Sequence, residues 1–159
     1  MIIPALFAIP FLVVPVKDTI WWNTVGGRVT EHRDATGATC SLMLYDERGS
    51  VVFEWTGGDT IAVTAIDWNW QFPDDWKMPV ALQVGEDWIS TGGGSPILQG
   101  VGHGNAVTFT LNQPVEDLLR PADHVAVRTQ TSVLSIKVDN YRIGTLIART
   151  RKCRDVIGK

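Results

Sequence analysis

The sequence predicts a mostly β protein, an antiparallel β-sandwich or barrel of about nine short strands with one short helix near residues 114–120. Three observations predict this class. Polar and apolar residues alternate with the period of two that places successive side chains on opposite faces of a strand. Turn signals rich in glycine, proline, aspartate and asparagine separate these runs. The chain lacks the alternation of strand and helix patterns that builds a parallel sheet.

The first half of the chain contains five strand patterns. A tryptophan-rich run over residues 19–29 ends at a Gly-Gly pair. Residues 39–45 and 50–55 flank a DERG turn and predict a β-hairpin. Residues 60–70 alternate between larger apolar side chains and smaller or polar ones, and residues 79–84 form a further run of strand type.

The second half combines a loop, a helix and more strands. Residues 91–105 contain six glycines and predict an irregular loop or a tight hairpin. Pro114 at a first-turn position, acidic residues after it and Pro121 beyond them predict a short helix. Further strands are predicted at residues 107–111, 125–129, 132–138 and 144–150.

The two cysteines, Cys40 and Cys153, have neither the spacing of a zinc site nor a CxxC redox motif. The simplest use for them is a disulfide. That bond would close a loop of more than a hundred residues, worth about 4 to 5 kcal/mol in the chain-entropy model. The alternative is a pair of buried, unpaired thiols in a cytosolic protein.

Residues 1–16 are uncharged and apolar, and they precede a single β domain at residues 17–159. The run is shorter than the about 20 residues that span a membrane as a helix. Its apolar core favours a signal-type segment, although no basic residue precedes it and three prolines interrupt it. An apolar arm that packs on the domain and a lipid-facing anchor are the alternatives.

The composition is that of a folded protein with few charges. Of the 159 residues, 45% are hydrophobic and 19% are charged, a balance that favours a packed core over disorder. The net charge of -3 gives no electrostatic reason to expect a nucleic-acid partner, because phosphate binding depends on clustered basic residues.

An aromatic cluster around an Asp-Asp turn is the main candidate binding site. Its residues are Trp68, Trp70, Phe72, Asp74, Asp75 and Trp76. Exposed indoles beside carboxylates can stack on sugars or anchor a protein interface. The alternative is core packing, because residues two apart on a strand share one face. By the same rule, the adjacent Trp21 and Trp22 are predicted to point to opposite faces.

Other residues give weaker indications of chemistry. Glu86 and His103, with the two aspartates of the aromatic cluster, are the candidate groups of a small hydrolase, provided that they converge in one pocket. The three histidines lack the spacing of metal ligands, so the sequence predicts no metal. No phosphate loop or nucleophile motif occurs, and no cofactor is expected.

The C-terminal third resembles a known family. A strand at residues 107–111, the PVEDLL helix, a polar strand at 125–129 and the run LSIKVDNYRIGTLIA resemble the ending of the invasion-associated locus B family of small exported bacterial proteins. The resemblance implies a secreted or periplasmic, mostly β, non-enzymatic protein. Cys40 and the WW segment lie outside it, and it carries over no functional residue.

The leading hypothesis is therefore a non-enzymatic, exported bacterial β-sandwich in the periplasm or outside the cell. It would bind a protein or cell-envelope component through the aromatic cluster, without a membrane span. The small hydrolase is one alternative. The other is a structural subunit, in a virion or surface layer, that self-assembles through the apolar N-terminal arm and free strand edges. The sequence leaves the oligomeric state open.

Overall fold

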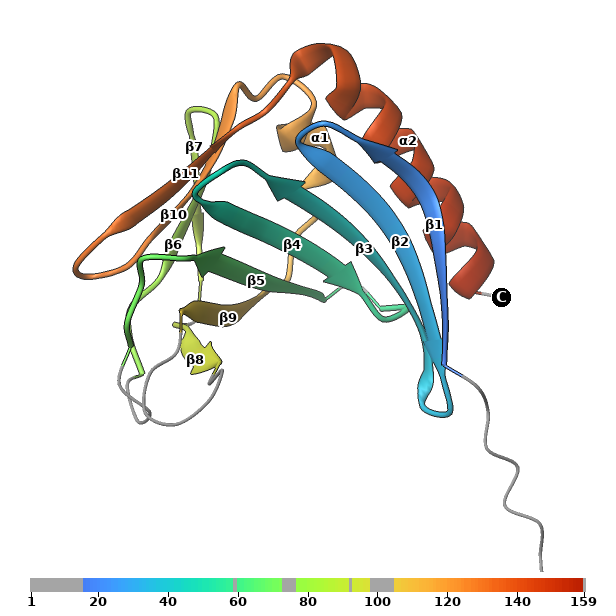
Figure 1. The fold of residues 1–159 in the computed structure, drawn as a ribbon, viewed down its shortest axis with the longest axis horizontal. Coiled ribbons are helices and arrows are strands. Elements are labelled where there is room, and N and C mark those ends of the chain that lie inside the picture. The colour runs from blue at the N-terminus through green and yellow to red at the C-terminus, as the bar shows by residue number, and fades with distance from the viewer. Residues whose placement is uncertain (1–15, 59, 73–76, 92, 98–104, 159) are drawn as a thin grey trace, which may run out of the picture.

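The computed structural model contains two antiparallel sheets and two helices (Figure 1). It describes residues 16–58, 60–72, 77–91, 93–97 and 105–158, and eleven strands lie within these ranges. The seven-stranded sheet has the order β1 (Lys17–Thr24), β2 (Gly27–Asp34), β3 (Gly37–Tyr45), β4 (Gly49–Trp55), β5 (Ile61–Asp67), β9 (Ala106–Leu111) and β8 (Ser95–Ile97). The four-stranded sheet has the order β11 (Val133–Lys137), β10 (His124–Arg128), β6 (Ala81–Val84) and β7 (Asp87–Ser90). The helices are α1 (Glu116–Leu119) and α2 (Asn140–Ile157).

The seven-stranded sheet buries one of its faces, here called the inner face. Every second residue of its central strands is buried, with half-buried residues between, as the period of two requires. The buried apolar residues of β3, β4 and β5 are Cys40, Leu42, Leu44, Val51, Phe53, Trp55, Ile61, Val63 and Ala65. They belong to one hydrophobic cluster that also contains residues of the smaller sheet and of α2.

Two different elements cover the inner face. The four-stranded sheet lies over one part of the large sheet, where β11 contacts β3, β4 and β5. Helix α2 lies over the other part and contacts β1, β2 and β3 (Figure 1). Its buried residues Ile143, Leu146 and Ile147 face the sheet. The second layer of the sandwich is therefore part sheet and part helix.

The predicted fold class is confirmed, as a sandwich of two sheets rather than a closed barrel. The predicted hairpin is present as β3 and β4, and α1 lies inside the range predicted for the short helix. Two strands that the sequence did not predict, β7 and β8, account for part of the difference from the expected nine.

The predicted strand over residues 144–150 is wrong, because these residues belong to α2. The buried residues of α2 are Ile143, Leu146, Ile147, Thr150 and Cys153, spaced three or four apart as on one face of a helix. The local sequence is rich in isoleucine and threonine, which favour strands. Packing against the large sheet overrides that preference.

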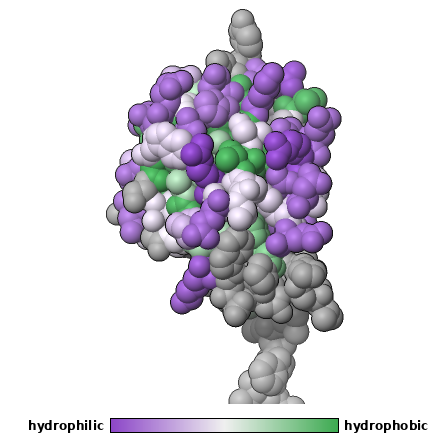
Figure 2. Space-filling model, turned by 90° about the vertical axis from the view of Figure 1, so that its left-hand side faces the viewer, coloured by the Kyte–Doolittle hydropathy of each residue, from purple (hydrophilic) through white to green (hydrophobic). Residues whose placement is uncertain are grey.

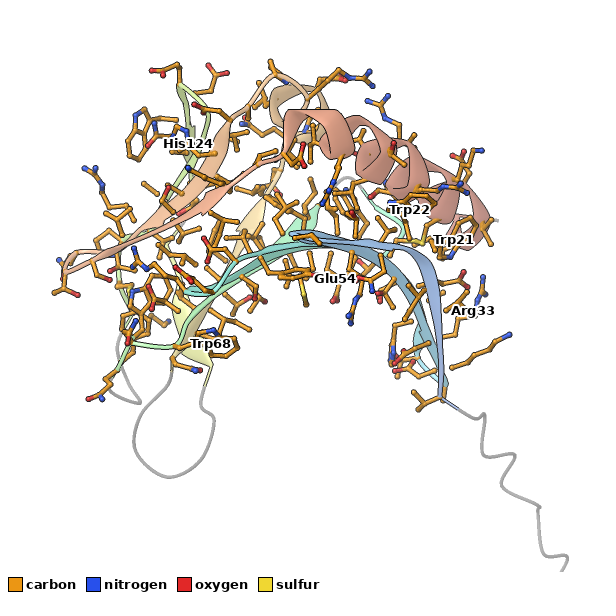
Figure 3. The ribbon with its side chains drawn as sticks, turned by 45° about the horizontal axis from the view of Figure 1, so that its top comes forward. Trp21, Trp22, Arg33, Glu54, Trp68 and His124 are labelled. Carbon is orange, nitrogen blue, oxygen red and sulfur yellow. A yellow bond between two sulfur atoms is a disulfide. The ribbon has the colours of Figure 1, made fainter. Side chains whose placement is uncertain are left out.

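The single strand predicted over residues 19–29 is two strands joined by a tight turn. Gly26 in that turn has φ +80, a conformation that glycine adopts without strain. The prediction that Trp21 and Trp22 point to opposite faces is also wrong, because the register of β1 shifts between Ile20 and Trp22. The Trp21 indole donates a hydrogen bond to Glu31 and the Trp22 ring lies under Arg149 of α2, so both lie on the α2 side (Figure 3).

A disulfide joins the predicted pair, Cys40 of β3 and Cys153 of α2, whose Cα atoms are 6.0 Å apart. Both cysteines are fully buried. The bond fixes the last turns of α2 to the large sheet across a sequence separation of 113 residues. Neither described helix is long and apolar enough to cross a membrane.

We expect the double substitution Cys40→Ala/Cys153→Ala to lower the free energy of unfolding by about 4 to 5 kcal/mol, because the unfolded chain regains the entropy of a long open loop. Guanidinium denaturation of the variant and of the oxidised protein measures the difference. A loss below about 1 kcal/mol would contradict this account of the bond.

Candidate functional site

The structure separates the residues of the predicted aromatic cluster. Trp68 is 59% exposed, whereas Trp70 and Phe72 are only 6% and 2% exposed and belong to the hydrophobic core. Asp74, Asp75 and Trp76 lie outside the described residues. For Trp70 and Phe72 the alternative of core packing therefore holds, and Trp68 is the described member available to a partner.

The turn that carries Trp68 is held by buried Asp67 at the end of β5. The Asp67 carboxylate accepts hydrogen bonds from Arg48, 2.9 Å from Nη2, and from the Asn69 backbone N–H, also at 2.9 Å. The Trp68 N–H donates to the Arg48 carbonyl at 3.2 Å and extends the pairing of β4 with β5 by one step. The turn is thus fixed at its base by a buried charge and its partners.

The residues that follow Trp68 anchor the turn from its other side. The rings of Trp70 and Phe72 pack against each other, with centroids 5.1 Å apart and planes inclined by 51°. Because both rings are buried, they hold the backbone on either side of the intervening residue. Trp68 is therefore an exposed indole on a turn with restricted freedom.

Trp68 continues the outer face of the seven-stranded sheet, here called the open face. The half-buried residues of its central strands on this face are Thr39, Ser41, Met43, Tyr45, Val52, Glu54, Ala62, Thr64, Ile66 and Thr108. The sheet is arched, and the smaller sheet and α2 lie on the convex side (Figures 1 and 3). No described helix or strand lies beneath the arch, where Figure 3 places Glu54 at the crown and Trp68 at the β5 end.

The register brings these side chains into rows that cross the strands. One row joins Ser41, Glu54 and Ala62, which are direct neighbours on β3, β4 and β5. The next row joins Met43, Val52, Thr64 and Thr108 on four adjacent strands. The open face thus combines hydroxyl groups, small apolar groups and the single carboxylate of Glu54 within this set.

A charged cluster borders the open face on β1 and β2. His32 Nδ1 lies 2.6 Å from an Asp18 oxygen, and His32 Nε2 lies 3.5 Å from an Asp34 oxygen. The hydrogen bond with Asp18 is the main reason why the pKa of His32 is raised from its ordinary value of 6.5, and Asp34 adds to the effect. The cluster therefore makes the stability of the β1–β2 pairing depend on pH.

Two adjoining cavities of about 320 and 300 Å³ lie where α2 ends, and both are lined by Trp55 and Arg154. The Arg154 guanidinium pairs with buried Glu116, and its carbon lies 5.3 Å from the centre of the Trp55 ring. Arg151 pairs with Asp117 at 2.8 Å. These pairs dock α2 on α1 and β4, so a structural role accounts for the charges.

The surface of the smaller sheet has a cavity of about 240 Å³, lined by Ala81 of β6 and Arg128 of β10 among others. Figure 2 faces this end of the molecule and shows hydrophilic side chains over most of it, with hydrophobic residues in small groups. Its exposed Trp88 lies beside Arg128, whose guanidinium carbon is 5.1 Å from the ring centre. A large apolar patch, the usual mark of a protein interface, is not seen on this face.

The described part of the structure does not bring together the residues that were candidates for a small hydrolase. Glu86 is exposed between β6 and β7, and His103, like the two aspartates of the aromatic cluster, lies outside the described residues. Within the described ranges, no group of three or more His, Cys, Asp or Glu side chains could hold a metal ion.

The sequence analysis identified Trp68 but missed the open face. The signal was present in the alternation of β3, β4 and β5, whose positions between the large apolar residues carry serine, threonine and glutamate. The pattern does not reveal which face of a sheet is covered, so only the position of the second layer defines the open face.

Comparison of the chain with protein-family models, with curated proteins and with solved structures found no match. The resemblance of the C-terminal third to the invasion-associated locus B family stays a prediction.

Protonation of His32 is expected to stabilise the fold. Because the folded-state pKa is raised, the contribution is complete below about pH 6.5 and is lost as the pH rises through the folded-state pKa. The difference in unfolding free energy between the native protein and His32→Gln should therefore shrink from about pH 6 to about pH 9. Denaturant titrations across this range measure it. Asp18→Asn should reduce the pH dependence, and an unchanged dependence in that variant would contradict the assignment.

Proposed function

We propose that this protein is a non-enzymatic, exported bacterial β-sandwich that binds a protein or cell-envelope component, with Trp68 as its main contact. One observation carries the proposal: a 59% exposed indole stands on a turn that is fixed by the buried Asp67 carboxylate. Export to the periplasm or the cell exterior is part of the proposal.

The energetics of binding support this role for Trp68. An exposed tryptophan offers a large apolar area and an N–H donor, and it is among the residues most enriched at binding hot spots. Ordering a mobile side chain or loop on binding costs free energy. The hydrogen bonds of Asp67 and the buried ring of Trp70 restrict the turn before the partner arrives.

The disulfide supports the proposed location. Bonds between cysteines form and persist in oxidising compartments and are rare in the cytosol of most organisms. The bond between Cys40 and Cys153 is buried and joins two secondary-structure elements, as structural disulfides do. The uncharged apolar sequence of residues 1–16 fits a signal-type segment.

Trp68→Ala should weaken capture of the partner at least about tenfold, because truncation of a hot-spot tryptophan removes its buried contact area. Immobilised native protein and variant are compared for retention of periplasmic and envelope fractions from the native host. Trp88→Ala is the matched control, since this tryptophan is 52% exposed but lies on the other sheet.

Thermal unfolding of both variants separates binding from folding. We expect similar melting temperatures for the two variants, because both side chains are largely exposed. Equal capture by the native protein and Trp68→Ala, or equal losses in the two variants, would contradict the proposal.

A further inference from the structure

The outer edge of β1 concentrates exposed apolar side chains. Of the eight large apolar side chains that the described residues expose, four lie within residues 16–25: Val16, Ile20, Trp22 and Val25. β1 is the first strand of the seven-stranded sheet, and no described strand pairs with its outer side (Figure 1). An exposed apolar edge strand is a ready template for pairing with another strand.

The other three sheet edges are protected against such pairing. β8 has three residues and contains Pro96, β7 has four residues, and β11 has five. Short strands and prolines are the usual means of preventing pairing at an edge. β1, in contrast, has eight residues and no proline, and its charged residues, Lys17 and Asp18, are confined to its start.

We infer that β1 pairs antiparallel with β1 of a second copy of this chain, so that the two large sheets become one continuous sheet. The inference goes beyond the proposed function and does not depend on Trp68. A symmetric dimer uses the same surface patch on both copies. The register that pairs all eight residues of β1 sets Lys17 opposite the partner's Thr24 and places the symmetry axis between Ile20 and Trp21.

This register matches the faces of the two strands. Direct neighbours across two strands lie on the same face of a sheet, so the pairing of β1 with β2 assigns Asp18 and Asn23 to the open face and Thr19 to the α2 side. In the dimer, Asp18 lies opposite the partner's Asn23, and Thr19 lies opposite the partner's Trp22. Both pairings join like faces. The bulge of β1 lies beside the symmetry axis, so it disturbs only the central pairs.

The exposed apolar side chains of the two copies cover one another in this register. Val16 lies beside Val25 of the partner subunit at each end of the pairing, and Ile20 lies diagonally beside its own symmetry copy. Trp21 and Trp22 of both copies gather on the α2 side. Tryptophan is enriched in the buried centre of protein interfaces. The pairing therefore removes from water the apolar surface that a single chain exposes.

The two ends of β1 are complementary in charge on the open face. The start of β1 carries Asp18, beside His32 and Asp34 of β2. At the other end, Arg28 of β2 donates a hydrogen bond to Asn23 at 3.3 Å and has no carboxylate partner among the described residues. Because Asp18 lies opposite the partner's Asn23, it comes next to the partner's Arg28. Two such contacts per dimer favour the antiparallel register.

The remaining charges near the edge do not oppose the pairing. Four of them are paired within each chain: Arg33 with Glu31 and Arg142 with Asp139. Lys17 lies at the end of the pairing, opposite the uncharged side chain of Thr24. Arg149 lies against the Trp22 ring. The two Trp22 residues are three positions apart along the paired strands, which is about 10 Å, so the two Arg149 side chains are well separated.

Other occupants fit this edge less well. Residues 1–15 are apolar, but Pro4, Pro10 and Pro15 leave no run longer than five residues without a proline. Proline cannot donate a backbone hydrogen bond to a neighbouring strand. A peptide of another protein can also add to a free edge, but the charges and apolar residues of β1 already complement a second β1.

Analytical ultracentrifugation of the full chain over a range of concentrations tests the inference. We expect a reversible dimer at high concentration. Ile20→Lys should raise the dissociation constant of the dimer at least about tenfold, because the two added charges lie beside each other across the axis. Val133→Lys is the matched control, since Val133 is an exposed apolar residue on β11, an edge strand of the other sheet, and this variant should dimerise like the native protein.

An exchange of charges tests the register. Asp18→Arg alone should raise the dissociation constant at least about fivefold, because the new arginine lies beside the partner's Arg28. Asp18→Arg combined with Arg28→Asp restores opposite charges at this place and should recover most of the lost affinity. Hydrogen exchange gives a readout in the native protein that needs no variant. The amides of residues 17–24 should exchange more slowly at concentrations where the dimer forms.

Three results would overturn the inference: the native protein is a monomer at every concentration, Ile20→Lys dimerises like the native protein, or the double charge exchange fails to recover affinity. Melting temperatures of the variants show whether each one folds, and slower exchange at β1 decides the matter in the native protein if one does not. Capture of envelope material through Trp68 is measured separately, so failure of the dimer leaves the proposed function standing.

Discussion

The stability of the fold depends on the burial of one face of the seven-stranded sheet. The sheet is too wide for the four-stranded sheet alone, and α2 covers the remainder over β1, β2 and β3. The Cys40–Cys153 bond and the pair of Arg154 with buried Glu116 hold the end of α2 in place. Because the four-stranded sheet and α2 both lie on one side of the large sheet, its opposite side is the open face.

The same division explains where binding groups can be presented. Large apolar residues of β3, β4 and β5 fill the core, and the alternate positions carry the hydroxyls and Glu54 of the open face. At the end of β5, Asp67 is buried and the next residue, Trp68, is exposed. The buried carboxylate of Asp67, through its two hydrogen bonds, thus fixes the point after which the chain is exposed at Trp68.

Stability and function are therefore assigned to different faces of one sheet. Residues of the inner face, the disulfide and α2 maintain the fold, and substitution of them is expected to act through unfolding. Residues of the open face can change with less effect on the core, since strands tolerate variation on a solvated face. This separation makes variants of Trp68 informative about binding.

The sequence by itself determined the β class, the hairpin of β3 and β4 and the cysteine pair, because alternation, turn residues and spacing are local properties. Tertiary structure alone decided that residues 144–150 are helical, that Trp70 and Phe72 are buried, and that Trp21 and Trp22 share a side. It also decided which face of the large sheet is open. The physical reason is that a period of two defines two faces without saying which one another layer covers, and packing against that layer outweighs the local preference of isoleucine and threonine for strands.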